Sequence, residues 1–188
     1  MRPAARRIGF TLLELMITLA VMAVLGAIAT PSFSAMLDRQ RLQAAAHHLQ
    51  ADIALARHES AKRRQTVHLR FQTGADWCYA LSTGTAGDCR QLATATLPGV
   101  IKLVRGSESD GVRLLQADAM AFQADNDAGL QALQAGQASF SSRAGLQLRL
   151  RLGPMGRASL CSPAGQLPGT PPCAAPVAPA APATAPAT

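Results

Sequence analysis

The feature that most constrains this chain is a run of 20 mostly apolar residues, 10–29, in which Glu14 is the one charged residue. As an α-helix, with a rise of about 1.5 Å per residue, this run would be about 30 Å long and could cross the hydrocarbon core of a bilayer. Residues 1–9 contain three arginines and no acid, and basic residues before a span keep that end in the cytoplasm. We therefore expect residues 10–30 to cross a membrane once, with the rest of the chain on the far side.

Two simpler interpretations of this N-terminus are a cleaved secretory signal, with Ala27-Ile28-Ala29 as its small-residue cleavage pattern, and an ordinary signal anchor. Glu14 argues against both, because a carboxylate in the membrane costs about 2.5–3.5 kcal/mol on insertion scales and needs a partner. If the chain were cut after Gly9, the new α-amino group of Phe10 would lie one helical turn from Glu14, in its own chain or in a packed neighbour. Such an ion pair would offset the cost of desolvation and set the axial register between helices.

The segment Arg-Arg-Ile-Gly9 followed by Phe10-Thr11-Leu12-Leu13-Glu14-Leu15 resembles the cleavage and methylation motif of type IV prepilins and type II secretion pseudopilins. The resemblance implies cleavage after Gly9 by a prepilin peptidase, N-methylation of Phe10, and a role for Glu14 in assembly of a helical filament. It also implies a bacterial inner-membrane protein with a periplasmic C-terminal head. The implied partners are other pilins or pseudopilins, the prepilin peptidase and the inner membrane itself.

Residues 31–64 predict the second, amphipathic half of one long helix. Pro31 lacks a backbone donor and should kink or interrupt the helix locally, at the place where the kink of pilin-like proteins falls. Charged residues such as Asp52 and Glu59 fall largely on other faces than the apolar residues. The apolar residues recur at intervals of three and four: Leu42, Ala45, Ala46, Leu49, Ile53 and Ala56.

Residues 65–173 predict a β-rich head, and together with the helix they indicate an α+β, pilin-like fold in which an antiparallel sheet covers the apolar face of the helix. We interpret Asp125–Gln137, which is rich in Ala, Gly and Gln, as an exposed excursion with a helical turn. Residues 174–188 contain 8 Ala and 4 Pro and are predicted to be a disordered tail, because they can bury too little apolar surface. Alternating or apolar segments predict strands at 66–71, 77–81, 100–104, 112–115, 120–122 and 145–152.

Four cysteines, at positions 78, 89, 161 and 173, lie on the non-cytoplasmic side of the predicted span, where disulfides persist. Three connectivities are open. We favour Cys78–Cys89 across the loop at 82–88, and Cys161–Cys173 as the tie from the last ordered loop to a strand. A zinc site would need close pairs such as C-x-x-C, which the chain lacks.

The remaining chemistry does not predict an enzyme, a metal site or a cofactor. His47 and His48 are adjacent and point about 100° apart on a helix, and His58 and His68 lie on either side of the helix end. We interpret all four as surface residues. No nucleophile motif, paired carboxylates or phosphate loop accompanies them, and Gly153-Pro-Met-Gly156 is typical of a turn.

The ending Leu152-Gly-Pro-Met-Gly-Arg-Ala-Ser-Leu-Cys161-Ser-Pro is similar to that of the GspH/FimT group. This group comprises the H-type minor pseudopilins of type II secretion and the T-type minor pilins of type IV pili. The resemblance implies a structural subunit that primes or joins a filament. The resemblance does not distinguish a subunit of a type II secretion system from a subunit of a type IV pilus.

The alternative function is DNA binding in natural transformation, because T-type minor pilins bind DNA through a C-terminal Gly-Arg-x-Arg motif. Here the corresponding residues are Gly156-Arg157-Ala158-Ser159, so the second arginine is missing. Together with Arg143, Arg149 and Arg151, Arg157 supplies a local charge of +4 with no acid after Asp127, enough for a few phosphate contacts. No aromatic residue is interleaved for base stacking, so a solvated basic strand is the simpler interpretation and DNA is the less favoured partner.

The net charge of +7 carries little weight in this choice. Cleavage after Gly9 would remove three arginines and leave a side-chain charge of +4. Much of the basicity is then a signal for topology and processing.

Overall fold

The computed structural model of the chain describes residues 10–84, 88–90, 98–109, 111–125, 129–153 and 155–173. Its first element is α1, a helix of 52 residues from Leu12 to Arg63. Thr11 caps its start, because its Oγ1 accepts a hydrogen bond from the backbone N–H of Glu14 at 3.2 Å. The helix ends where Arg64 adopts a left-handed conformation, with φ of 53°.

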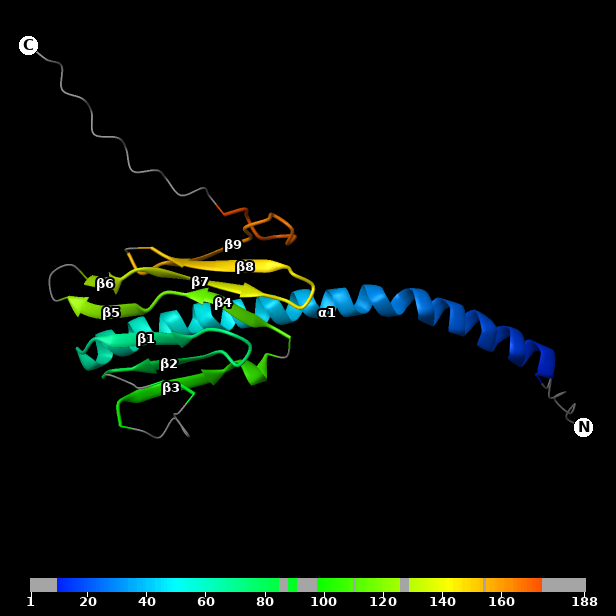
Figure 1. Ribbon diagram of the computed structural model, residues 1–188, viewed down its shortest axis with the longest axis horizontal. Coiled ribbons are helices and arrows are strands. Elements are labelled where there is room, and N and C mark those ends of the chain that lie inside the picture. Colours follow the sequence, from blue (N-terminus) through cyan, green and yellow to red (C-terminus); the bar gives the residue numbers. More distant parts are fainter. Residues whose placement is uncertain are drawn as a thin grey trace, which may run out of the picture.

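The N-terminal half of α1 projects from the head, as the blue half of the helix in Figure 1 shows. Its apolar side chains between Leu12 and Leu25 are exposed. Among the described residues, α1 is the one helix whose length and composition would suffice to cross a membrane. The helix continues across Pro31 without a break. The expected interruption at this proline is therefore absent, and the expected kink stays a prediction. We call residues 12–41 of α1 the stalk.

The C-terminal half of α1 is covered by the strands of the head (Figure 1). It buries one apolar stripe, as the spacing of three and four residues predicted. The charged residues follow this pattern less well, since Asp52 and Glu59 are buried as well. The stripe that faces the core comprises Leu42, Ala45, Ala46, Leu49, Ile53 and Ala56.

The head contains two antiparallel sheets and not the single sheet expected from the sequence. A five-stranded sheet has the order β3-β2-β1-β5-β6, and a four-stranded sheet has the order β4-β7-β8-β9. Both sheets contact α1, so the C-terminal half of this one helix packs against two sheets. The strands are β1 (Val67–Gln72), β2 (Cys78–Ser82), β3 (Val100–Arg105), β4 (Arg113–Ala117), β5 (Met120–Asp125), β6 (Gly129–Gln134), β7 (Gly136–Ser141), β8 (Gln147–Leu152) and β9 (Ala158–Cys161).

The irregular excursion with a helical turn expected at 125–137 is wrong where the structure describes this segment, because Asp125, residues 129–134 and residues 136–137 pair as strands. β5 and β6 form a hairpin whose register places Asp125 opposite Gly129, and β7 follows at once and pairs with β4 and β8. The residues of β6 and the start of β7 have low intrinsic β-propensity. Backbone hydrogen bonding to the neighbouring strands therefore outweighs the local preference.

Trp77 joins the two sheets inside the core. Its indole N–H donates to the carbonyl oxygen of Val112 at 2.8 Å, its ring stacks on Tyr79 of β2, and its edge meets Phe140 of β7. A Cβ on Gly106 would lie 2.7 Å from the indole, so only glycine lets the backbone after β3 pass this ring. The core of the head therefore centres on one aromatic side chain that touches both layers.

Two disulfides close loops of the head, with the pairing favoured above. Cys78 of β2 bonds to Cys89, and Cys161 of β9 bonds to Cys173. The second bond holds residues 162–173 beside β9, where Ser162 also exchanges backbone hydrogen bonds with Pro171 and Cys173. The proposed tail at 174–188 lies outside the described residues.

Candidate functional site

The first turn of α1 holds the residues of the predicted assembly motif. Phe10 precedes the helix and is 83 % exposed, and Glu14 is the acid in the first turn. The backbone N–H of Leu15 donates to the carbonyl oxygen of Thr11 at 3.2 Å, which extends the cap. An acid in this position also interacts favourably with the helix dipole. Gly9 and the rest of the predicted leader at 1–9 lie outside the described residues.

The carboxylate of Glu14 has no ionic partner among the residues that the structure describes. Its neighbours on α1 are exposed apolar side chains, including Leu13, Met16 and Ile17. A carboxylate on such a surface is costly in lipid or in a packed helix bundle unless a cation meets it.

A partly buried ion pair joins α1 to the five-stranded sheet, and the sequence did not predict it. Asp52 is only 3 % exposed. One carboxylate oxygen lies 2.6 Å from Nζ of Lys102 on β3, and the other accepts a hydrogen bond from the hydroxyl of Tyr79 at 2.8 Å. The available signal was the spacing of Asp52 from Leu49 and Ala56, which places it at the edge of the buried stripe.

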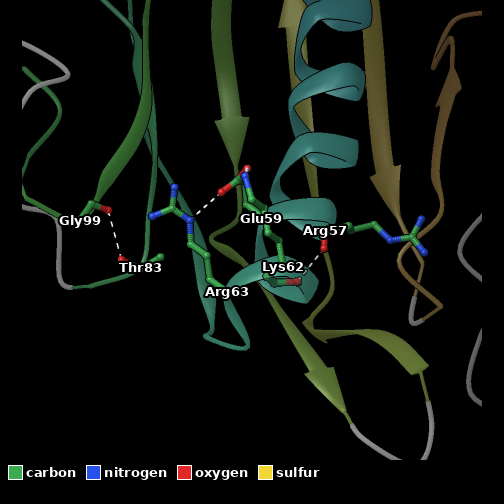
Figure 2. A network of polar contacts seen from close by, with 7 residues as sticks. Arg57, Glu59, Lys62, Arg63, Thr83 and Gly99 are labelled. Atoms are coloured by element: carbon green, nitrogen blue, oxygen red, sulfur yellow. Dashed lines mark hydrogen bonds and ion pairs between the residues drawn. The ribbon is translucent and has the colours of Figure 1, made fainter.

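A second carboxylate, Glu59, stands at the C-terminal end of α1. Nε of Arg63 donates to Glu59 at 2.6 Å, and Nζ of Lys62 lies at 3.9 Å (Figure 2). The hydrogen bond from Arg63 holds the pKa of Glu59 below its ordinary value, and the charges of Arg63 and Lys62 lower it further against the opposing effect of burial. Nearby in the same view, Thr83 and Gly99 close the base of the loop between β2 and β3.

The structure separates the arginines that the DNA-binding interpretation grouped together. Arg149 and Arg151 lie on the outer face of β8, opposite the buried leucines, and Nε of Arg149 donates to Oγ of Ser139 at 3.1 Å. Gly156 and Arg157 lie in the turn between β8 and β9. Arg143 lies in the turn before β8, at the other end of a strand of six residues, which is about 20 Å long.

The histidines and cysteines are placed in unlike surroundings. His47, His48 and His58 are exposed on α1, and His68 is half-buried on β1. One group of ligand-type atoms, from Cys78, Asp88 and Cys89, lies within 4.8 Å. Its two sulfurs are bonded to each other, so this group lacks the thiolates that a metal site would use.

A cleft of about 500 Å³ lies beside the first disulfide. Its lining includes His68, Arg70 and Asp88, but none of the described residues that line it is a serine, a threonine or a free cysteine. His68 therefore has no hydroxyl or thiol nucleophile to activate in this cleft.

Comparison with known families assigns both parts of the chain. Residues 5–30 match the prokaryotic N-terminal methylation motif, and residues 45–159 match type II transport protein GspH. No curated protein and no solved structure matches the chain. The GspH match covers more than half of the residues, and the two matches together support a pseudopilin or minor-pilin role in type II secretion or in a pilus. The chain therefore belongs to the GspH family of type II transport proteins and carries a prokaryotic N-terminal methylation motif.

Proposed function

We propose that this protein is a minor subunit that primes or joins a filament at the inner membrane, in a type II secretion pseudopilus or a type IV pilus. One observation carries the proposal: the stalk exposes an apolar surface with an unpartnered Glu14 in its first turn, among the residues that the structure describes. Neither lipid alone nor the head satisfies that carboxylate. A bundle of sister helices that brings a cationic N-terminus to it does.

Maturation would supply the missing cation. Cleavage after Gly9 frees the α-amino group of Phe10, and N-methylation keeps its positive charge while adding apolar surface. At one helical turn from Glu14, this group reaches the acid of its own chain or of a neighbour. The second arrangement fixes the axial offset between two subunits, because only one stagger brings the opposite charges together.

The apolar helix and the prepilin-type motif suggest anchoring in the inner membrane. We propose that the head lies in the periplasm. Its two disulfides support this side of the membrane, because the cytoplasm keeps thiols reduced. The membership of the GspH family supports a structural and not an enzymatic subunit.

The first test is the mass of the mature membrane protein. We expect the intact mass to correspond to a chain that begins at methylated Phe10. The same protein from cells without prepilin peptidase should retain residues 1–9. A mature chain that begins after Ala29 would instead identify a secreted protein and would remove the argument for a filament.

DNA binding is the second candidate function, and it rests on the two arginines that share the outer face of β8. The described residues after Asp125 include no Asp or Glu, while Arg149 and Arg151 share the outer face of the strand. Phosphate contacts by these two side chains would be sequence-independent and strongly salt-dependent.

We expect any binding of duplex DNA by the detergent-solubilised chain to weaken with salt. The combined change Arg149→Gln and Arg151→Gln should reduce the slope of log K against log salt by about 2, because each arginine would neutralise one phosphate. Arg39→Gln with Arg64→Gln removes the same charge elsewhere and should leave that slope unchanged. No binding at low salt would eliminate the DNA function.

A further inference from the structure

The turn between β8 and β9 lies where α1 ends, at the end of the head away from the stalk (Figure 1). The backbone N–H of Gly156 donates to the carbonyl oxygen of Gly153 at 2.9 Å. The N–H of Gly153 donates to the carbonyl oxygen of Arg157 at 3.0 Å. Met155 stands at the turn and is 77 % exposed. Two backbone hydrogen bonds therefore hold the described part of the turn, and Met155 and Arg157 are exposed on it.

Arg57 of α1 packs beneath this turn. Figure 2 shows its side chain extending away from Glu59 and Arg63. A Cβ on Gly156 would lie 3.1 Å from Nε of Arg57, and Gly156 has a φ of +68°. The left-handed backbone conformation therefore favours glycine at this position, and a larger residue would also have to displace the arginine by a few tenths of an ångström.

The guanidinium of Arg57 has no hydrogen-bond or ionic partner among the described residues, and its Nε is fully buried. An unsatisfied buried donor is unfavourable and calls for an explanation. The residue as a whole is only half-buried, and Arg157 beside it is exposed. Among the described residues, neither Arg57 nor Arg157 has an acidic partner in an ion pair, and the two arginines flank the same glycine.

The side chains around these arginines favour a protein over a nucleic acid as the ligand. Stacking on single-stranded bases needs exposed aromatic rings, but the large aromatic residues of the described head, such as Trp77 and Phe140, are buried. The exposed apolar side chain at the turn is Met155. Methionine and arginine are enriched in protein–protein interfaces, and methionine adapts to irregular apolar surfaces.

We propose that Arg57, Met155 and Arg157 form a docking surface for an acidic and partly apolar face of a neighbouring filament subunit. This inference rests on the proposed function and adds to it a point of contact between heads. The stalk fixes how subunits pack along the membrane-spanning layer. The docking surface lies at the opposite end of the head, so it selects the neighbour that sits ahead of this subunit in the filament.

The proposal can be tested in the full chain, in cells, with a photo-crosslinking amino acid in place of Met155. We expect an adduct with a protein that itself carries a methylated pilin-type N-terminus, identified by mass spectrometry. The combined change Arg57→Gln and Arg157→Gln should lower the adduct yield about tenfold, as expected for the loss of two charge pairs of about 0.7 kcal/mol each at the contact with the partner. Arg149→Gln with Arg151→Gln removes two arginines from the outer face of β8 and should leave the yield unchanged.

A second crosslinker in place of Leu19, on the stalk, separates this inference from the proposed function and reports on folding of the variants. A stalk adduct with a pilin-type protein together with no such adduct at position 155 would overturn the docking surface alone. The same holds for an adduct at 155 that survives the loss of both arginines, and for an adduct that nuclease removes, which would indicate DNA. No pilin-type adduct from either position would overturn both proposals.

Discussion

Replacement of Glu14 by alanine is expected to leave cleavage and methylation intact and to reduce incorporation of the subunit into filaments by at least about tenfold. The change removes the one acid of the apolar run and leaves the charged N-terminus of a neighbouring chain unpaired. A lone charge within the bilayer costs up to about 2.5–3.5 kcal/mol on insertion scales, which corresponds to about a hundredfold in an equilibrium. The mature subunit can be quantified in sheared filaments and in the membrane fraction, with its N-terminus checked by mass.

Thr11→Ala is the matched control for this experiment. It removes the hydroxyl that caps the helix at the backbone of Glu14 but keeps the carboxylate. Loss of such a cap costs about 1 kcal/mol of helix stability, so we expect incorporation close to that of the unchanged protein. Normal incorporation of Glu14→Ala would contradict the proposed role of the acid in setting the register between subunits.

Trp77→Ala is expected to lower the free energy of unfolding of the head by about 3–5 kcal/mol, the range typical for removal of a large buried aromatic side chain. Trp77 is 2 % exposed and contacts Tyr79 and Phe140 as well as the carbonyl of Val112. The cavity would open between the two sheets. A shift of either sheet to fill it would break contacts with the other sheet, so we expect little relaxation. Pulse proteolysis of the detergent-solubilised chain in urea measures this loss, and a reduced level of the protein in cells should accompany it.

Two variants calibrate the effect of Trp77→Ala. Trp77→Phe keeps an aromatic ring against Tyr79 and Phe140 but leaves the carbonyl of Val112 without its donor, so we expect a smaller loss. Met155→Ala changes an exposed side chain and should alter the free energy of unfolding by no more than about 0.5 kcal/mol. A loss below about 1 kcal/mol for Trp77→Ala would show that Trp77 does not hold the two sheets together.

The elements whose period is local were predictable from the sequence. The stripe from Leu42 to Ala56 repeats every three to four residues and is buried as predicted. β8 alternates Leu148, Leu150 and Leu152 with polar residues and forms a strand with the leucines inside. In both cases one face is apolar, so burial of that face chooses the conformation without reference to any other segment.

The strands whose composition opposes their conformation were not predictable in this way. β6 and β7 have a composition that favours loops, and they become strands because β5, β4 and β8 offer them backbone hydrogen bonds. The division into two sheets was not predictable either, because the chain passes from one sheet to the other between β3 and β4, between β4 and β5, and between β6 and β7. Strand pairing and packing decide these features, and the local residue pattern does not encode them.

The same division applies to the candidate sites. The motif around Gly9, Phe10 and Glu14 could be recognised in the sequence because its residues lie close together along the chain, and the match of residues 5–30 to the N-terminal methylation motif agrees with it. The partners of Asp52 and the unpaired state of Arg57 emerged only from the folded head, because an ion pair or a buried donor is defined by what a neighbouring strand brings to it. Helix chemistry is local and can be recognised along the chain, whereas the polar contacts of this head exist only once two sheets have packed on one helix.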